Sequence, residues 1–114
     1  MQKKHIINIA IVIILIAIGG YVVLKSINSI GQIATEEEAK CIGNNTILYV
    51  QTGCPHCKAQ EELFGENLKY IKITDCLVTP NKCSDITHVP TWSINNKKYE
   101  GFKSIAELKQ LTGC

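Results

Sequence analysis

The chain has 114 residues, of which 46% are hydrophobic and 19% charged, and its formal net charge is +2. The basic residues do not form a stripe, and the few aromatic residues are not interleaved with them. Composition and charge therefore argue against a nucleic-acid-binding protein, which would gather basic residues on one surface.

An apolar segment, 6–24, follows a short basic stretch at the N-terminus. It contains nineteen residues and no charge, which is enough to span a bilayer as a helix. The apolar core of a cleaved signal peptide is about 7 to 15 residues long and precedes a site of small residues. This segment instead stays apolar from Gly19 through Val23, so we expect a retained transmembrane helix over residues 6–24.

Basic residues on the two sides of this segment predict its orientation. Lys3, Lys4 and His5 precede it, and only Lys25 follows it closely. Because cytosolic flanks carry the excess of basic residues, we expect residues 1–5 in the cytosol. The remainder of the chain would then lie on the extracytosolic side of the cell membrane.

All six cysteines lie beyond the apolar segment. Small extracytosolic domains commonly use disulfides to supplement a limited hydrophobic core, so the cysteine distribution agrees with this topology. We interpret residues 25–40 as a juxtamembrane linker and residues 41–114 as the folded domain. The acidic triplet Glu36, Glu37 and Glu38 is interpreted as a solvated surface of the linker.

The folded part shows alternating strand and helix patterns. Strands are expected over 47–51, 70–73, 91–94 and 97–100, helices over 55–64 and 105–111, and a short irregular or helical piece over 81–86. Gly65 ends the first helix, the pair Asn95-Asn96 suits a tight hairpin turn, and Ser104 with Glu107 forms a capping box. The order β-α-β-α-β-β-α predicts an α/β domain with a central four-stranded sheet.

Two cysteines, Cys54 and Cys57, follow the first predicted strand and open the first predicted helix. Unpaired backbone N–H groups and the helix dipole stabilise an anion at that position, so the Cys54 thiolate should form at a lower pH than a free thiolate. Pro55 suits the first helical turn because it lacks only an N–H group that has no helical partner there. The pattern predicts a redox-active pair of thiols.

Together these motifs resemble the thioredoxin-like superfamily. The resemblance is carried by Cys-Pro-His-Cys at 54–57, Val-Pro-Thr-Trp at 89–92 before a hairpin, and the terminal helix. The wider run of residues is most similar to the thioredoxin-like domain fused to bacterial vitamin K epoxide reductase homologues. The Cys-Pro-His-Cys motif is also similar to that of DsbA-like thiol oxidases, although the chain has no room for their large helical insertion.

The resemblance implies roles for individual residues. Cys54 would be the attacking thiol and Cys57 the resolving thiol, with Pro90 as a cis-proline beside them. The peptide groups of Val89 would pair with an extended substrate. His88 would lie at the rim of this substrate site, and Pro55 would belong to the same site.

Two positions bear on the direction of electron flow. His56, between the thiols, would stabilise the Cys54 thiolate and so make the disulfide more oxidising. The buried carboxylate that thioredoxins carry on the first strand is replaced by Leu48, which leaves Cys57 without an obvious proton acceptor and mildly favours an oxidase. An exposed glutamate or a water molecule could take that place.

Four cysteines lie outside the motif. Cys76 and Cys83 bracket a turn, and a disulfide closing that loop would contribute roughly 2.5 kcal/mol; a second redox pair that relays electrons is the alternative. Cys41 and Cys114 lie near the two ends of the domain and are expected to pair, contributing about 4 kcal/mol. The spacing of Cys76 and Cys83 is too wide for a usual zinc site, so we expect no metal.

The sequence thus predicts a membrane-anchored, extracytosolic thiol-disulfide oxidoreductase without a bound cofactor. It would oxidise the cysteine thiols of substrate proteins through a Cys54–Cys57 disulfide. The resemblance implies that a quinone-linked membrane partner, similar to vitamin K epoxide reductase homologues, reoxidises it. The alternatives are a membrane-tethered disulfide reductase or isomerase, and then a metal-binding or non-catalytic binding module.

Overall fold

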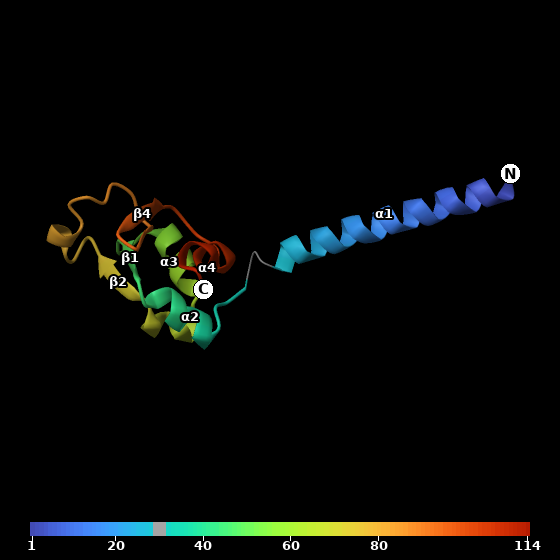
Figure 1. Ribbon diagram of the computed structural model, residues 1–114. Helices are drawn as coiled ribbons and strands as arrows, with labels where there is room; N and C mark the ends of the chain where they lie inside the picture. Colours follow the sequence, from blue (N-terminus) through green and yellow to red (C-terminus); the bar gives the residue numbers. More distant parts are fainter. Residues whose placement is uncertain (29–31) are drawn as a thin grey trace. The chain divides into compact units, whose positions relative to one another are not determined.

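The computed structural model describes residues 1–28 and 32–114 (Figure 1). These form two units, a single helix α1 (Gln2–Asn28) and a folded domain, Gln32–Cys114. The part of α1 from Gln2 to Leu24 has a mean hydropathy of 2.8, and by length and composition alone it could cross a membrane. It includes the segment 6–24 that the sequence predicts to span the bilayer.

The domain is built on a four-stranded mixed sheet in the order β2-β1-β3-β4. Its strands are β1 (Thr46–Val50), β2 (Lys72–Asp75), β3 (Thr91–Ile94) and β4 (Lys97–Glu100). Strands β1 and β2 run parallel, whereas β3 is antiparallel to both β1 and β4. This is the thioredoxin-like α/β arrangement that the sequence predicts.

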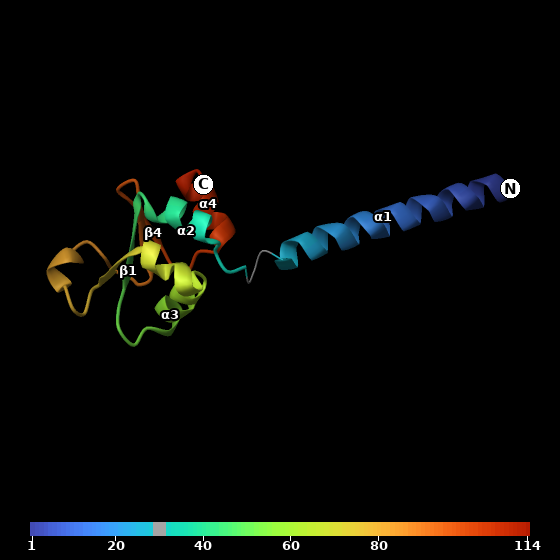
Figure 2. The same cartoon turned by 90° about the horizontal axis from the view of Figure 1, so that it is seen from below.

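The helices of the domain cover one side of this sheet. In Figures 1 and 2, α2 (Glu36–Gly43), α3 (Pro55–Glu62) and α4 (Ile105–Thr112) lie on the same side of β1. The orange loop that carries a short 3-10 helix, η2 (Pro80–Lys82), lies on the other side. All four residues of β3 are buried, as expected for a central strand that is covered on both faces.

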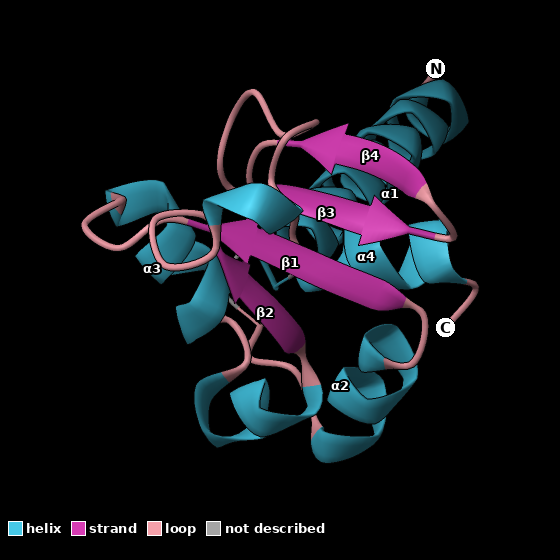
Figure 3. Ribbon diagram, turned by 90° about the vertical axis from the view of Figure 1, so that its left-hand side faces the viewer, coloured by secondary structure: helices cyan, strands magenta, loops and turns pink. Residues whose placement is uncertain are grey.

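Local sequence signals explain most of the boundaries. Asn95 and Asn96 have φ values of 50° and 66° in the turn between β3 and β4 (Figure 3), which asparagine tolerates better than most residues. The predicted capping box forms at α4, where Ser104 and Glu107 exchange hydrogen bonds. Gly113 ends this helix in the left-handed conformation.

The chain between α3 and β2 departs from the expected pattern. Helix α3 ends at Glu62 rather than at residue 64, and a 3-10 helix η1 (Gly65–Tyr70) follows, so that β2 begins at Lys72. The backbone N–H of Phe64 donates to the carbonyl of Glu61 at 3.0 Å, three residues back, which tightens the last turn. This tightening accompanies the complete burial of the Phe64 side chain in the core.

Helix α2 corrects the predicted linker. The expected linker 25–40 and the expected domain start at 41 are wrong, because the compact unit begins at Gln32 and α2 crosses that boundary. Thr35 caps the helix and exchanges hydrogen bonds with Glu38 in a capping box. Ala39 and Ile42 are fully buried. This segment therefore belongs to the core of the domain.

The acidic triplet at the start of α2 is more than a solvated surface. Glu38 accepts a hydrogen bond from the Lys109 ammonium group of α4 at 2.7 Å. This ammonium group, together with the backbone N–H of Thr35, lowers the pKa of the Glu38 carboxyl. At the other end of the helix, Gly43 approaches the carbonyl oxygen of Tyr70 so closely that a Cβ atom would clash. Both contacts hold α2 against the rest of the domain.

A single hydrophobic core joins these elements. Trp92 and Leu48, which lie opposite each other in the β1–β3 register, are fully buried. The rings of Phe64 and Trp92 are 5.9 Å apart between centroids. Cys57 belongs to the same buried cluster. The core therefore extends from α2 and α4 to the first turn of α3, where the cysteine motif lies.

Candidate active site

Cys54 and Cys57 lie at the start of α3, directly after β1 and a short turn. They form a disulfide, with their Cα atoms 5.3 Å apart. Cys54 is the N-cap residue of α3, and its sulfur accepts a hydrogen bond from the backbone N–H of Cys57 at 3.2 Å. Pro55 occupies the first helical turn, as predicted. A backbone N–H group thus points at the sulfur that would carry negative charge after reduction.

The two sulfur-bearing residues differ in burial. Cys57 is 2% exposed and belongs to the hydrophobic core, whereas Cys54 is half-buried. Gly53, just before the motif, has a φ of 87° and carries no side chain that would cover Cys54. An incoming thiol can therefore approach Cys54, while Cys57 is reached only from inside the domain.

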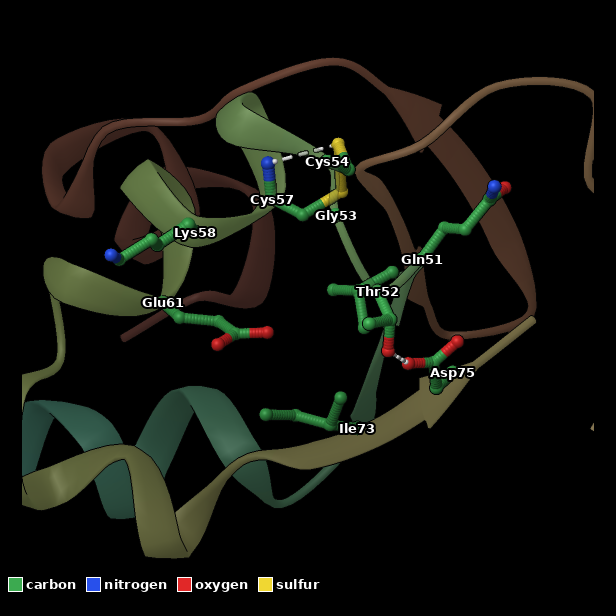
Figure 4. Close-up of a pocket in the computed structure, with 10 residues that line it drawn as sticks. Gln51, Thr52, Gly53, Cys54, Cys57, Lys58, Glu61, Ile73 and Asp75 are labelled. Carbon is green, nitrogen blue, oxygen red and sulfur yellow. Dashed lines mark hydrogen bonds between the residues drawn. A yellow bond between two sulfur atoms is a disulfide. The ribbon is translucent and has the colours of Figure 1, made fainter. Parts of the chain in front are cut away.

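A pocket of about 330 Å³ lies beside the disulfide (Figure 4). It is enclosed by the end of β1, the turn that follows, the first turns of α3, and β2. Its lining residues are Val50, Gln51, Thr52, Gly53, Cys54, Cys57, Lys58, Glu61, Ile73 and Asp75. Both cysteines thus share one cavity with two carboxyl groups and one ammonium group.

The two carboxyl groups in this pocket have different environments. Asp75 accepts hydrogen bonds from the Thr52 hydroxyl and from the backbone N–H of Leu77, and these bonds lower its pKa. Burial raises the pKa of Glu61, and the nearby charge of Asp75 raises it further. Asp75 is therefore held as the carboxylate, whereas Glu61 accepts a proton more readily than an ordinary glutamate.

The remaining predicted site residues are placed as follows. The Val89–Pro90 peptide bond is cis, Pro90 is buried, and Val89 packs against the core cluster that also contacts Cys54. His56 is exposed on the first turn of α3. His88 is exposed in the loop before β3, and its Nδ1 lies 3.5 Å from a Glu100 carboxylate oxygen.

These placements separate the predicted residues into two groups. Cys54 and Cys57 line the pocket, whereas His56, His88, Val89 and Pro90 are not among its lining residues. Thr87 and His88 hydrogen-bond to Glu100 and lower the pKa of its carboxyl. His88 is thus tied to the β4 end of the sheet, and its predicted contact with substrate stays a prediction.

The other four cysteines form two further disulfides. Cys41 of α2 is bonded to Cys114 just after α4, and Cys76 is bonded to Cys83 across the loop after β2. These are the pairings that we expected from the positions of the cysteines. The first joins the two ends of the domain, and the second closes the loop that leads to the cis peptide bond.

Comparisons with known proteins give limited matches. No known family profile matches the chain. The chain is 35% identical over 77 residues to the thiol-disulfide oxidoreductase LTO1 of Arabidopsis thaliana, a match that covers 58% of this chain and 20% of that protein. The chain therefore spans about a fifth of the length of this relative. Among solved structures, it is similar to the alkylhydroperoxide reductase protein AhpF of Enterococcus faecalis, C503A mutant, with a TM-score of 0.47 and 19% identity over 71% of this chain and 45% of that one.

The polar residues of the pocket were not predicted from the sequence. Glu61 lies four residues after Cys57, a spacing that puts both on one side of a helix, and this signal was available in the sequence. Asp75 and Thr52 meet because Val50 pairs with Asp75 in the parallel β1–β2 register. That contact depends on strand pairing between distant parts of the chain and has no local signature.

Proposed function

We propose that the protein is a thiol-disulfide oxidoreductase that acts through the Cys54–Cys57 pair. The observation that carries the proposal is the position of this disulfide at a helix N-terminus, with one accessible and one buried sulfur. The name of the Arabidopsis relative, thiol-disulfide oxidoreductase, supports the same chemistry. The fold places no bulky group over Cys54, because Gly53 precedes it.

The reaction is thiol-disulfide exchange at the Cys54 sulfur. A substrate thiolate attacks this sulfur, the Cys54–Cys57 bond breaks, and its electron pair passes to the Cys57 sulfur. A second thiolate of the substrate then attacks the substrate sulfur of the mixed disulfide and expels the Cys54 thiolate. The substrate gains a disulfide and loses two electrons, and the protein is left as a dithiol.

We propose that the protein works in the oxidising direction. The N–H group aimed at the Cys54 sulfur and the helix N-terminus stabilise the thiolate, and thiolate stabilisation favours the reduced dithiol and so makes the disulfide a stronger oxidant. His56 in the motif would add to this effect. The buried position on β1 held by a carboxylate in thioredoxins is Leu48, which is fully buried here.

A disulfide reductase or isomerase is the second candidate. One observation favours it: the half-buried Glu61 lies in the same pocket as Cys57, so a proton acceptor for the resolving thiol is present after all. A reductase needs such an acceptor to release its substrate from a mixed disulfide. The resemblance to oxidases and the thiolate environment of Cys54 nevertheless support oxidation.

The reduction potential of the Cys54–Cys57 couple separates the two directions. The full chain would be equilibrated with glutathione redox buffers and acid-quenched, and peptide mass mapping would follow this disulfide apart from the other two. We expect a potential closer to that of DsbA, about −120 mV, than to that of thioredoxin, about −270 mV. A value near −270 mV would favour the reductase, and a pair that never exchanges with glutathione would contradict both.

We further propose that α1 anchors the domain to the cell membrane with residues 1–5 in the cytosol. The length and hydropathy of α1 and the basic residues before it support this topology. A quinone-linked membrane oxidoreductase, similar to vitamin K epoxide reductase homologues, would reoxidise the dithiol. Tethering both proteins to one membrane would raise their effective concentration relative to each other.

A further inference from the structure

The burial of Cys57 creates a requirement for proton transfer inside the domain. Its side chain belongs to the hydrophobic core and is 2% exposed. In each exchange this sulfur either leaves as a thiolate or must become one before it attacks, and burial among apolar groups disfavours a thiolate. A group in contact with the pocket must therefore supply and accept the proton.

Glu61 is placed to meet this requirement. It lies four residues after Cys57 on α3, so the two side chains leave the helix on the same face. Both line the pocket beside the disulfide, and Figure 4 shows the Glu61 carboxylate directed into that cavity. Bulk water reaches the carboxyl, because Glu61 is only half-buried.

The other charged groups around the pocket are less suited to carrying this proton. Asp75, at the end of β2, is held as a carboxylate by Thr52 and by backbone N–H groups, so its pKa lies below the ordinary range. Lys58 is exposed and carries a positive charge. Burial and the Asp75 charge together raise the pKa of Glu61 toward the range in which a carboxyl group exchanges protons efficiently.

We propose that Glu61 carries the proton to and from the Cys57 sulfur across this pocket. The inference rests on the proposed exchange reaction and adds its proton-transfer residue. When the Cys54–Cys57 bond breaks, the protonated Glu61 carboxyl gives its proton to the departing Cys57 thiolate, which leaves a carboxylate and a thiol. In the reverse step the Glu61 carboxylate removes the Cys57 proton, the thiolate attacks Cys54, and the substrate sulfur leaves with the electron pair.

Two-step kinetics with an aromatic disulfide can isolate this step. The full chain, reduced selectively at Cys54–Cys57, is mixed with dithionitrobenzoate. Cys54 attacks first and releases one thionitrobenzoate, and Cys57 then attacks the mixed disulfide and releases the second. We expect Glu61→Gln to slow the second release by about 10²-fold near neutral pH, the low end of general acid–base effects, and to leave the first release unchanged.

The pH profile distinguishes proton transfer from a structural effect. In the wild type, the rate of the second release should rise as the Glu61 carboxyl loses its proton, above the ordinary carboxyl range because its pKa is raised. In Glu61→Gln this rise should disappear, and the rate should follow only the ionisation of the Cys57 thiol at higher pH. The matched control Glu62→Gln, at an exposed neighbouring position on the same helix, should behave as the wild type.

The possible results separate this inference from the proposed function. A second release in Glu61→Gln that equals the wild-type rate at every pH would overturn the role of Glu61, and so would an equal slowing of both releases. A wild-type chain without a fast first release would instead show that the proposed function is wrong.

Discussion

Replacing Cys54 with serine is expected to abolish thiol-disulfide exchange, lowering the rate by more than about 10³-fold, because the reacting sulfur is removed. Cys57 cannot substitute for it, since its side chain is buried in the core. The assay follows the oxidation of a reduced, unfolded protein by the full chain, with oxidised glutathione as the terminal oxidant. Loss of free thiols is measured over time.

Cys57→Ser should give a different defect in the same experiment. Cys54 keeps its accessible position and the N–H group of residue 57, so it still attacks disulfides. Without the resolving thiol, the resulting mixed disulfides should accumulate and be recovered after acid quenching on non-reducing gels. The same variant, expressed in native membranes, would retain the natural substrates as adducts.

A double variant outside the motif controls for general damage. Cys76→Ser with Cys83→Ser removes a disulfide whose residues do not line the pocket, so exchange should continue at close to the wild-type rate. A strong loss in this control would favour the alternative that Cys76 and Cys83 relay electrons. Exchange that survives Cys54→Ser unchanged would mean that the chain is a binding module with a thioredoxin-like fold.

Opening the Cys41–Cys114 disulfide is expected to be the most destabilising disulfide change. Its cysteines are 73 residues apart, whereas Cys76 and Cys83 are 7 apart. In the chain-entropy model the double variant Cys41→Ser with Cys114→Ser loses about 4 kcal/mol of unfolding free energy, against about 2.5 kcal/mol for the short loop. The long loop includes nearly the whole domain, so its closure restricts the unfolded chain more.

The position of this disulfide adds a local consequence. Cys41 lies on α2, which is also held to α4 by the Glu38–Lys109 ion pair. Urea unfolding of the full chain can be followed by the fluorescence of Trp92, the single tryptophan, which is fully buried. A smaller loss for the Cys41–Cys114 variant than for the Cys76–Cys83 variant would contradict the entropic account.

Most of the sheet could be predicted because its signals are local. The strands Thr91–Ile94 and Lys97–Glu100 agree with the predicted ranges, since the Asn95-Asn96 turn fixes where each strand ends. Helix α4 was equally clear from its capping box and from Gly113. The cysteine motif is also local, and so its place at the start of α3 followed from the sequence.

Helix α2 was missed for two physical reasons. Its capping box, Thr35 with Glu38, is present in the sequence, but the acidic residues beside it were interpreted as a solvated surface. The contact that makes this helix part of the domain joins Glu38 to Lys109, 71 residues away. Such a contact depends on the packing of α2 against α4, which no short segment of the chain encodes.

The pocket shows the same limit at the site. The spacing of Cys57 and Glu61 is visible in the sequence, but the burial of Glu61 and the charge of Asp75 beside it are not. Both depend on the parallel pairing of β1 with β2, which brings Asp75 to the end of β1. The sequence therefore indicated the reacting sulfurs, and the fold added the acid–base group near them.

The ionisation of Cys54 tests the central claim most directly. In the full chain reduced at Cys54–Cys57, the rate of alkylation of each cysteine is measured against pH by mass mapping. The helix N-terminus and the N–H group of Cys57 should lower the pKa of Cys54 clearly below the value of a free thiol, about 8.5, while the buried Cys57 titrates higher. A Cys54 thiol that ionises at about 8.5 or above would contradict the account.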